Sequence, residues 1–522
     1  IVIAFVYASP VLDGKALAQT DVVQSKAMQS ELLRYEQPDG TRPLWTNQMF
    51  GGMPAYQLGI QYSGSIASGI ITGIAKMFPA PSHLILLYCL CAYLLFVVLG
   101  LNFWISLLGA VAVGFTSYNF IIIEAGHMNK GLAIAFFPLI LAACLLAYRK
   151  NYIWAAILAA ISMALELRAG HIQMTYYLFL SIGLLIILQA WLAYKAKEWR
   201  GFLIGSAALA LGMLIGISTN ITNIMVNREY VSETMRGGTE LSLNEADKKV
   251  ATGLDKDYAY QWSQGIGECI TFMIPNAYGG GSGTKLPDDA AAVKLLTEKG
   301  VAKNQAEGFI GQYSYWGPKP FTSGPTYFGA IILFLFILGM FISKNPLKWW
   351  ILTAVLLSVC LSLGKHFDSF SNLFFDYFPM YNKFRAVESI LVIAGLLIPV
   401  LAAITLQEII DANADKQKEI LKTGKKVVYG IAGVLVLLWL IPSAFFDFQG
   451  ESDKAVSEQM MQMSNGDQAF SDQVVGALHV DREQLFKDDT LRSLLFIAFA
   501  IALLYLLLGK KTKKEYALAG LA

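Results

Sequence analysis

The sequence has little charge: only 15% of its 522 residues are Asp, Glu, Lys or Arg, whereas 55% are hydrophobic. The mean hydropathy is +0.51, which excludes ordinary soluble domains and intrinsically disordered chains. The 40 basic residues lie in short clusters between apolar runs, so the charge pattern predicts no nucleic-acid partner. The composition is that of a polytopic membrane protein in contact with a lipid bilayer.

Cysteine is also scarce, with five residues in the chain, four of them inside apolar runs. Their spacing fits neither a disulfide framework nor a zinc site. The sequence contains no Walker loop, no dinucleotide-binding glycine pattern followed by a helix, no HExxH and no kinase signature. ATP hydrolysis by this chain is therefore not expected. The paired, interrupted helices typical of secondary transporters are missing as well.

Long apolar runs are the main feature of this sequence. A segment that crosses a bilayer needs about 20 residues and satisfies its backbone hydrogen bonds as a helix. Residues 1–8 are apolar but too few, so we expect the end of a first helix in a piece of a longer protein. With it, the sequence predicts an all-α polytopic bundle of about 12 transmembrane helices. The other spans are expected near 83–100, 102–123, 131–148, 152–167, 172–193, 201–224, 326–342, 348–363, 386–406, 426–445 and 491–509.

Basic clusters predict how the spans are oriented. If the spans alternate in direction, the clusters all lie on one side, which the positive-inside rule makes cytoplasmic. The clusters are 149–150, 195–200, 344–348, 416–426 and 510–514. The segments expected on the extracytoplasmic side are 9–82, 124–130, 168–171, 225–325, 364–385 and 446–490.

The domain organisation expected from these spans alternates membrane and outer parts. Transmembrane helices fill 83–224 and 326–445, and a last one with a cytoplasmic turn fills 491–522. A first outer loop with juxtamembrane helices occupies 9–82, a large outer loop 225–325 and a further one 446–490. Loops this long are usually functional or form a small subdomain, so we expect a small periplasmic layer.

Ionisable groups gather at the outer ends of the predicted spans. Asp21 follows the first apolar segment, and two turns, Glu124–Lys130 and Glu166–Gln173, share the tripeptide Ala-Gly-His. Ionisable groups at membrane depth are costly and are functional by default. A carboxylate can accept a proton or bind a cation, and Lys and Arg can bind phosphate. The candidate site residues are Asp21, Glu124, His127, Glu166, His171, Gln173, Lys383 and Arg385.

Each of these groups also has a purely structural interpretation. The carboxylates could cap helices or form local ion pairs, as Glu166 could with Arg168. Lys383 and Arg385 could anchor in lipid headgroups, because basic residues near helix ends commonly do so. The convergence of all of them on one face favours a functional site.

Some motifs are more distinctive than the apolar runs. They are Ser9-Pro-Val-Leu-Asp-Gly14, Gln19-Thr-Asp-Val-Val-Gln24, Leu44-Trp-Thr-Asn-Gln-Met-Phe-Gly-Gly-Met-Pro54, Ala125-Gly-His-Met-Asn-Lys130, Ala169-Gly-His-Ile-Gln-Met-Thr-Tyr-Tyr177 and Phe384-Arg-Ala386. Together they resemble the bacterial YfhO membrane proteins, in the version found in Bacteroidetes, over residues 9 to about 408. That family is similar to the GT-C glycosyltransferases, which take a sugar from a polyprenyl-phosphate carrier on the extracytoplasmic side.

The resemblance implies roles for individual residues. Asp21, placed just after the first helix, would be the catalytic base or help to hold the acceptor. Glu124 and His127 would match a second acidic or metal-linked site, and Arg385 would grip the carrier phosphate. The turns contain no Asp-x-Asp pair, so no cofactor is implied with certainty, although Glu124 and His127 could bind a divalent cation. Gram-positive relatives would glycosylate teichoic polymers, which Bacteroidetes lack, so the envelope acceptor is unknown.

We therefore expect a glycosyltransferase of the bacterial inner membrane, with Lys383 helping Arg385 to bind the donor phosphate. Two other classes stay open. A transporter or flippase of a lipid-linked or sugar substrate would use the same polar cavity without chemistry and would open to both sides. A structural subunit of an envelope assembly would copurify with a partner. The near absence of acidic or His residues deep in the spans favours the enzyme.

Overall fold

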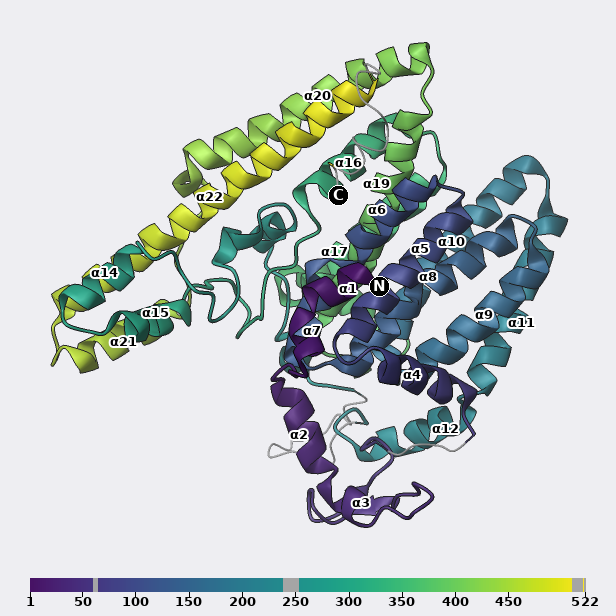
Figure 1. The fold of residues 1–522 in the computed structure, drawn as a ribbon, viewed down its shortest axis with the longest axis horizontal. Helices are drawn as coiled ribbons and strands as arrows, with labels where there is room; N and C mark the ends of the chain where they lie inside the picture. The colour runs from purple at the N-terminus through teal and green to yellow at the C-terminus, as the bar shows by residue number, and fades with distance from the viewer. Residues whose placement is uncertain (60–63, 238–252, 509–519, 521–522) are drawn as a thin grey trace. The chain divides into compact units, whose positions relative to one another are not determined.

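The computed structural model describes residues 1–59, 64–237, 253–508 and 520 (Figure 1). In these residues the fold is all-α, with one small two-stranded hairpin. Over the same residues, seven helices are long and apolar enough to cross a membrane, or up to nine if each bent helix pair is one span. The chain is thus a multi-pass membrane protein by helix length and composition.

The chain divides into two compact units. The first comprises residues 1–100, 122–258 and 376–384, and the second comprises 101–121, 259–375 and 385–522. The helices of the first unit are α1 (Val2–Tyr7), α2 (Thr20–Met28), α3 (Ser30–Arg34), α4 (Ile66–Met77), α5 (Ser82–Leu99), α8 (Met128–Tyr148), α9 (Tyr152–Arg168), α10 (Ile172–Ala196), α11 (Trp199–Ser218) and α12 (Ile221–Tyr230), with the 3-10 turns η1 (Ser9–Asp13), η2 (Val231–Glu233) and η7 (Tyr381–Lys383).

Helix α8 is the centre of the first unit, because it is buried over most of its length and packs on α5 and α9. Gly131 at the start of α8 lies against Leu84 and Tyr88 at the start of α5, so the two helices begin at the same end. Tight turns join α8, α9 and α10 in sequence, which brings the start of α10 to that end too. We call this end of the first unit, with the turns at Gly126–His127 and Gly170–His171, the site face.

Helices α9 and α11 lie side by side in the first unit (Figure 1). Small residues make this close approach possible. A Cβ placed on Gly212 would come within 2.3 Å of the Ala156 carbonyl oxygen, and one on Gly216 within 2.6 Å of the Ala160 oxygen. Moving four residues along α11, from Gly212 to Gly216, moves the contact four residues along α9, from Ala156 to Ala160, so the two helices run parallel.

A β-hairpin occupies the aromatic, glycine-rich segment between Leu44 and Pro54. Strands β1 (Trp45–Thr46) and β2 (Met53–Pro54) pair antiparallel. Gly52 has φ of 123°, and a Cβ there would meet the Trp45 ring at 2.8 Å, so a larger residue does not fit. The Glu31 carboxylate accepts hydrogen bonds from the backbone N–H groups of Asn47 (2.8 Å) and Gln48 (3.1 Å), which fixes the hairpin to α3.

The second unit is built around α19 (Leu391–Ile410), which packs on α6, α16 and α17. Its other elements are α6 (Phe103–Gly114), η4 (Gly267–Phe272), η5 (Pro275–Tyr278), α14 (Ala291–Glu298), α15 (Lys303–Gly311), α16 (Ala330–Ile342), α17 (Leu347–Ser362), η6 (Gly364–Phe367), η8 (Val387–Ile390), α20 (Ala414–Leu440), η9 (Pro442–Ala444), α21 (Asp453–Met463) and α22 (Gln468–Leu508). Three helices, α7 (Ser117–Ala125), α13 (Lys256–Tyr260) and α18 (Asp368–Tyr377), cross from one unit into the other.

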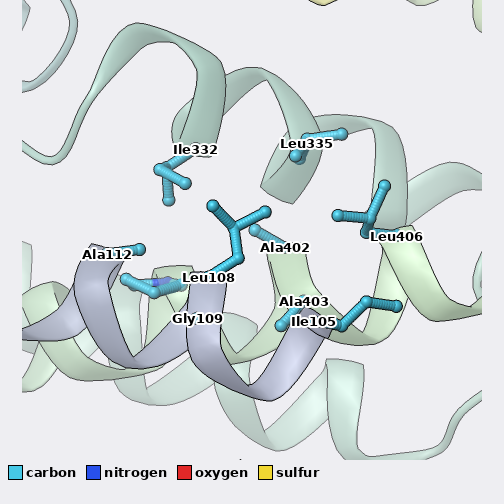
Figure 2. A pocket seen from close by; sticks show the side chains of 10 residues that line it. Ile105, Leu108, Gly109, Ala112, Ile332, Leu335, Ala402, Ala403 and Leu406 are labelled. Carbon is cyan, nitrogen blue, oxygen red and sulfur yellow. The ribbon is translucent and has the colours of Figure 1, made fainter. Parts of the chain in front are cut away.

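A small apolar pocket, partly open to its surroundings, lies between α6, α16 and α19 of the second unit (Figure 2). Its lining is Ile105, Leu108, Gly109, Ala112, Ile332, Leu335, Pro399, Ala402, Ala403 and Leu406. Because no polar side chain lines it, this pocket offers no group for catalysis or for polar recognition.

The second unit also contains a small helical layer built from two distant segments. Helices α14 and α15 share one apolar core with α21 and the first turns of α22. Arg482 of α22 is fully buried and donates to the Asp453 carboxylate (2.8 Å) and to the carbonyl oxygens of Phe448 (2.9 Å) and Tyr313 (2.8 Å). His479 contacts the second Asp453 oxygen at 2.7 Å. One guanidinium therefore joins three stretches of chain.

Each full-length predicted span coincides with a helix or a bent helix pair, but the predicted number of about twelve is not reached. Helix α9 has 17 residues and α16 has 13, fewer than the roughly 20 that a straight span requires. The predicted span 326–342 becomes helical only at Ala330, after Gly329 with φ of 96°. The predicted outer loop 446–490 is largely helical, because α22 begins at Gln468. The basic cluster 510–514 lies outside the described residues.

Candidate functional site

Asp21 lies on the site face and contacts His127. It occupies the first turn of α2, and its Oδ2 is 2.9 Å from His127 Nε2. A carboxylate only accepts, so the His127 nitrogen carries the proton in this contact. Both side chains are about half exposed, at 50% and 48%. The pair is therefore fixed in orientation but accessible to a ligand.

The turn before α8 is shaped to receive the segment that carries Asp21. Gly126 has φ of 87°, and a Cβ there would lie 3.2 Å from Asp21 Cβ and 3.3 Å from Gln19 Cβ. Gln19 is 6% exposed and donates to the Ile123 carbonyl oxygen and, at 3.7 Å, to Met128 Sδ. Glycine at 126 lets the two backbones approach, and Gln19 holds them together.

Glu166, in the last turn of α9, is fully buried. One of its carboxylate oxygens accepts a hydrogen bond from the Thr175 hydroxyl at 2.7 Å. The other, Oε2, has no hydrogen-bond partner within the described parts of the chain. Burying an unsatisfied carboxylate oxygen is costly, so Glu166 is an unusual group at the end of a span.

His171 begins α10, one helical turn before Thr175. Burial first, and the neighbouring basic side chains of Lys130, His127 and Arg236 to a smaller extent, lower the pKa of His171 to about 3. Its Nδ1 is buried without a hydrogen-bond partner among the described residues. The imidazole is therefore neutral at physiological pH and lies in a region of positive potential.

An aromatic group covers the first turns of α10. The Tyr176 ring lies 5.2 Å from Phe384 and 6.3 Å from Tyr381, and Gln173 Nε2 donates to the Tyr177 hydroxyl at 3.0 Å. These contacts bring the 381–384 segment to the site face, although it follows more than 200 residues later in the sequence.

Lys383 and Arg236 are joined by reciprocal hydrogen bonds. Lys383 Nζ donates to the Arg236 carbonyl oxygen at 2.6 Å, and the Arg236 guanidinium donates to the Lys383 carbonyl oxygen. Burial lowers the pKa of Lys383. Each cationic side chain is therefore held at the backbone of the other residue, and Lys and Arg are the side chains that bind anions such as phosphate.

Two predicted site residues, Glu124 and Arg385, do not take part in the contacts described above. Glu124 ends near the site face on α7 but is exposed. Arg385 belongs to the second unit and is exposed there, just before η8. Arg168, expected to pair with Glu166, donates instead to the Ser68 hydroxyl of α4. Over the described residues, no group of three or more His, Cys, Asp or Glu side chains is arranged for a metal ion, and Glu124 and His127 form no such group.

Sequence reasoning missed a buried charge cluster in the second unit. Lys319 Nζ lies 2.6 Å from Glu388 and 3.3 Å from Glu268, and Lys319 and Glu268 are nearly inaccessible, with side-chain exposures of 1% and 2%. The Tyr315 hydroxyl donates to Glu268 at 3.1 Å. Burial disfavours the charge on Lys319, but the two carboxylates outweigh it and raise the pKa of Lys319.

Other residues that the sequence reasoning missed are Gln19, Lys130, Thr175 and Arg236. Lys130 could have been found from sequence, because a lysine three residues after His127 enters an otherwise apolar helix. Arg236 gives no such signal, since its contact with Lys383 joins residues 147 apart. In comparisons with known proteins, no family model, no curated protein and no solved structure matches this chain.

Proposed function

We propose that this protein is a membrane glycosyltransferase that moves a sugar from a polyprenyl-phosphate donor to an acceptor on the extracytoplasmic side. The observation that carries the proposal is the Asp21–His127 contact of 2.9 Å at the site face, because it holds a half-exposed carboxylate next to the ends of the spans. A carboxylate in that place can accept a proton from a hydroxyl nucleophile.

Asp21 acts as general base in this proposal. The acceptor hydroxyl loses its proton to Asp21 as its oxygen attacks the anomeric carbon of the donor sugar. A new C–O bond forms, the bond between the anomeric carbon and the phosphate oxygen breaks, and polyprenyl phosphate leaves with the bonding electrons. Polyprenyl phosphate, the phosphate monoester that is released, is a weakly basic leaving group, so one carboxylate is enough, whereas glycosidases use two.

His127 is a positioning residue, because it holds one oxygen of Asp21 and leaves the other for the acceptor. Lys383 and Arg236 bind the donor phosphate, supported by the reciprocal hydrogen bonds that hold the two residues together. A divalent cation near Glu124 is compatible with the proposal but not required by it.

The proposal includes a GT-C-like topology of about 12 spans in the bacterial inner membrane, with the site face extracytoplasmic and the acceptor in the cell envelope. The count approaches this number if α9, α16 and the two bent pairs cross the bilayer together with the seven long helices. The acceptor then approaches the half-exposed Asp21 from the outer side, and the lipid donor approaches from the membrane.

Sugar transfer from a radiolabelled polyprenyl-phosphate hexose in membranes tests the function. The wild type and Asp13→Asn, an exposed aspartate in η1, are expected to form a labelled product. Asp21→Asn should lower the rate by about 100-fold or more, the usual contribution of a general base. Donor that binds to every variant but is consumed by none, including the wild type, would favour a transporter or flippase.

A further inference from the structure

The buried charge cluster of the second unit reaches the surface through Glu388. Lys319 and Glu268 are 1% and 2% exposed, whereas the Glu388 side chain is 17% exposed and presents Oε2 to Lys319 at 2.6 Å. Glu268 is satisfied from inside, because it accepts from the Tyr315 hydroxyl at 3.1 Å and from the Gly265 N–H at 3.0 Å. Glu388 is therefore the member of the cluster that can accept a hydrogen bond from a ligand.

Two aromatic residues, Trp262 and Phe321, adjoin this cluster. The Trp262 carbonyl oxygen accepts a hydrogen bond from the Glu388 N–H at 3.3 Å. The Trp262 indole N–H donates to the Phe321 carbonyl oxygen at 3.2 Å, and the two ring centroids are 5.3 Å apart with the ring planes at 83°. Phe321 follows Lys319 by two residues and is 60% exposed. An open aromatic ring is thus fixed, through its backbone, beside the exposed end of the cluster.

Two polar atoms in the adjoining turns have no hydrogen-bond partner within the described parts of the chain. One is Oε1 of the fully buried Gln264, and the other is Nε2 of His366. The Gln264 amide donates to the Glu268 carbonyl oxygen at 3.1 Å, and the Lys365 N–H donates to Ser263 Oγ at 3.2 Å, which joins the two turns. Buried polar atoms usually have partners. A hydroxyl suits either atom, because it both donates and accepts.

An open aromatic ring beside a partly exposed carboxylate is suited to a carbohydrate. A pyranose has a face of C–H groups that packs on an aromatic ring, and its hydroxyls donate to carboxylates. Ligand sites typically combine apolar surface with a few polar groups that fix the orientation of the ligand. In this cluster two carboxylates surround one ammonium group, so the cluster favours neutral hydroxyls over phosphate.

We infer that the second unit binds a neutral carbohydrate, with the C–H face of a sugar on Phe321 and one of its hydroxyls donating to Glu388. Trp262 fixes the backbone of Phe321, and Lys319 holds one oxygen of Glu388 and leaves the other for the sugar. The inference rests on the proposed function in one respect, because the bound carbohydrate is then the acceptor of the transferred sugar. Binding itself requires neither donor nor transfer.

Binding of the full chain in phospholipid nanodiscs to an array of neutral and acidic oligosaccharides tests the inference. The array carries oligomers of hexoses and N-acetylhexosamines together with phosphorylated and uronic-acid oligomers. The wild type is expected to bind neutral oligosaccharides. Phe321→Leu should weaken this binding about fivefold or more, because leucine removes the aromatic face, whereas Phe321→Tyr should retain it. Phe445→Leu is the matched control, since Phe445 is 51% exposed and lies outside the cluster.

A second pair of variants tests the carboxylate. Glu388→Gln should weaken binding of the same oligosaccharides by about tenfold, because a neutral amide forms weaker hydrogen bonds with hydroxyls than a carboxylate does. Glu298→Gln, at an exposed carboxylate on α14, should bind as the wild type does. Retained monodispersity shows that each variant folds.

Equal binding by the wild type and Phe321→Leu would overturn the inference. A wild type that binds only acidic oligosaccharides, or none of the array, would overturn it as well. Failure of the proposed function gives a different result, in which the wild type binds neutral oligosaccharides through Phe321 and Glu388 but transfers no sugar. Sugar transfer that is unchanged in a protein without this binding would leave the proposed function intact and remove the carbohydrate site.

Discussion

At the scale of single residues, His171 makes the stability of the first unit sensitive to acid. Burial and three neighbouring cations lower the pKa of His171 from 6.5 to about 3. Between these values the unfolded chain binds a proton that the folded chain does not, so stability falls as the pH falls. Above pH 6.5 His171 does not lower the free energy of unfolding. Below pH 6.5 the free energy of unfolding falls progressively, because the unfolded chain takes up a proton that the folded chain does not.

We predict that His171→Gln weakens the acid sensitivity of the protein. Between pH 7 and pH 5 the wild type should lose roughly 2 kcal/mol through this residue, and the variant should not. The measurement is the midpoint of thermal unfolding in detergent, followed by thiol-reactive dye fluorescence at each pH. Identical pH profiles for the two proteins would show that His171 is protonated normally in the folded state.

Lys319, unlike His171, is buried in its charged form and is stabilised there by the carboxylates of Glu268 and Glu388. Lys319→Met leaves the Glu268 and Glu388 carboxylates without a cation, so we predict a loss of about 3–5 kcal/mol of unfolding free energy. Lys285→Met is the matched control, because Lys285 is 66% exposed and its ion pairs should contribute less than about 1 kcal/mol. Denaturant unfolding in mixed micelles measures both.

A second variant separates lost charge pairing from poor packing at Lys319. Adding Glu388→Gln to Lys319→Met removes one of the two uncompensated carboxylates, so part of the lost stability should return. If the double variant is less stable than Lys319→Met alone, the cluster is held by packing rather than by charge.

At the scale of helices, glycine sets the distance between α9 and α11. We predict that Gly212→Ala lowers stability by about 1–3 kcal/mol, because its Cβ would come within 2.3 Å of the Ala156 oxygen and the backbones must separate. Gly430→Ala in α20 is the control, since its Cβ would meet nothing within 4 Å. Its unfolding temperature should stay equal or rise slightly. A Gly212→Ala protein as stable as Gly430→Ala would contradict the close packing.

Helix bends show what hydropathy cannot predict. The apolar run 102–123 reads as one span, yet the structure bends it by 42° between α6 and α7. The Thr116 hydroxyl donates to the Ala112 and Gly395 oxygens, and the Asn119 amide donates to the Val113 and Gly114 oxygens. These side chains satisfy carbonyl groups that lose helical partners at the bend. Thr116 and Asn119, two polar residues in an apolar run, were the sequence feature that could have indicated this bend.

At the scale of the whole molecule, sequence predicts the helices well and the polar contacts poorly. Apolar runs locate the membrane helices because hydrocarbon forces the backbone to satisfy itself locally. The Asp21–His127 contact was expected only as a shared face, and the Lys383–Arg236 and Lys319–Glu388 contacts were not expected. Such contacts depend on how distant loops pack, which local patterns do not encode.

The helical layer of α14, α15, α21 and α22 illustrates the same limit. Sequence indicated that 225–325 could form a subdomain, but its apolar core is completed by Val456, Met460 and Val474 from a segment assigned to another loop. Neither segment has enough apolar surface alone to form a core. The pairing becomes visible only when both are placed in space.

The measurement that tests the central claim most directly is the stoichiometry of transfer by purified protein in proteoliposomes. With wild type and Asp13→Asn, each labelled sugar that reaches an acceptor should release one polyprenyl phosphate, and Asp21→Asn should reduce both by about 100-fold or more. Asp21→Asn protein that transfers sugar at the wild-type rate would contradict the assignment of Asp21 as the base.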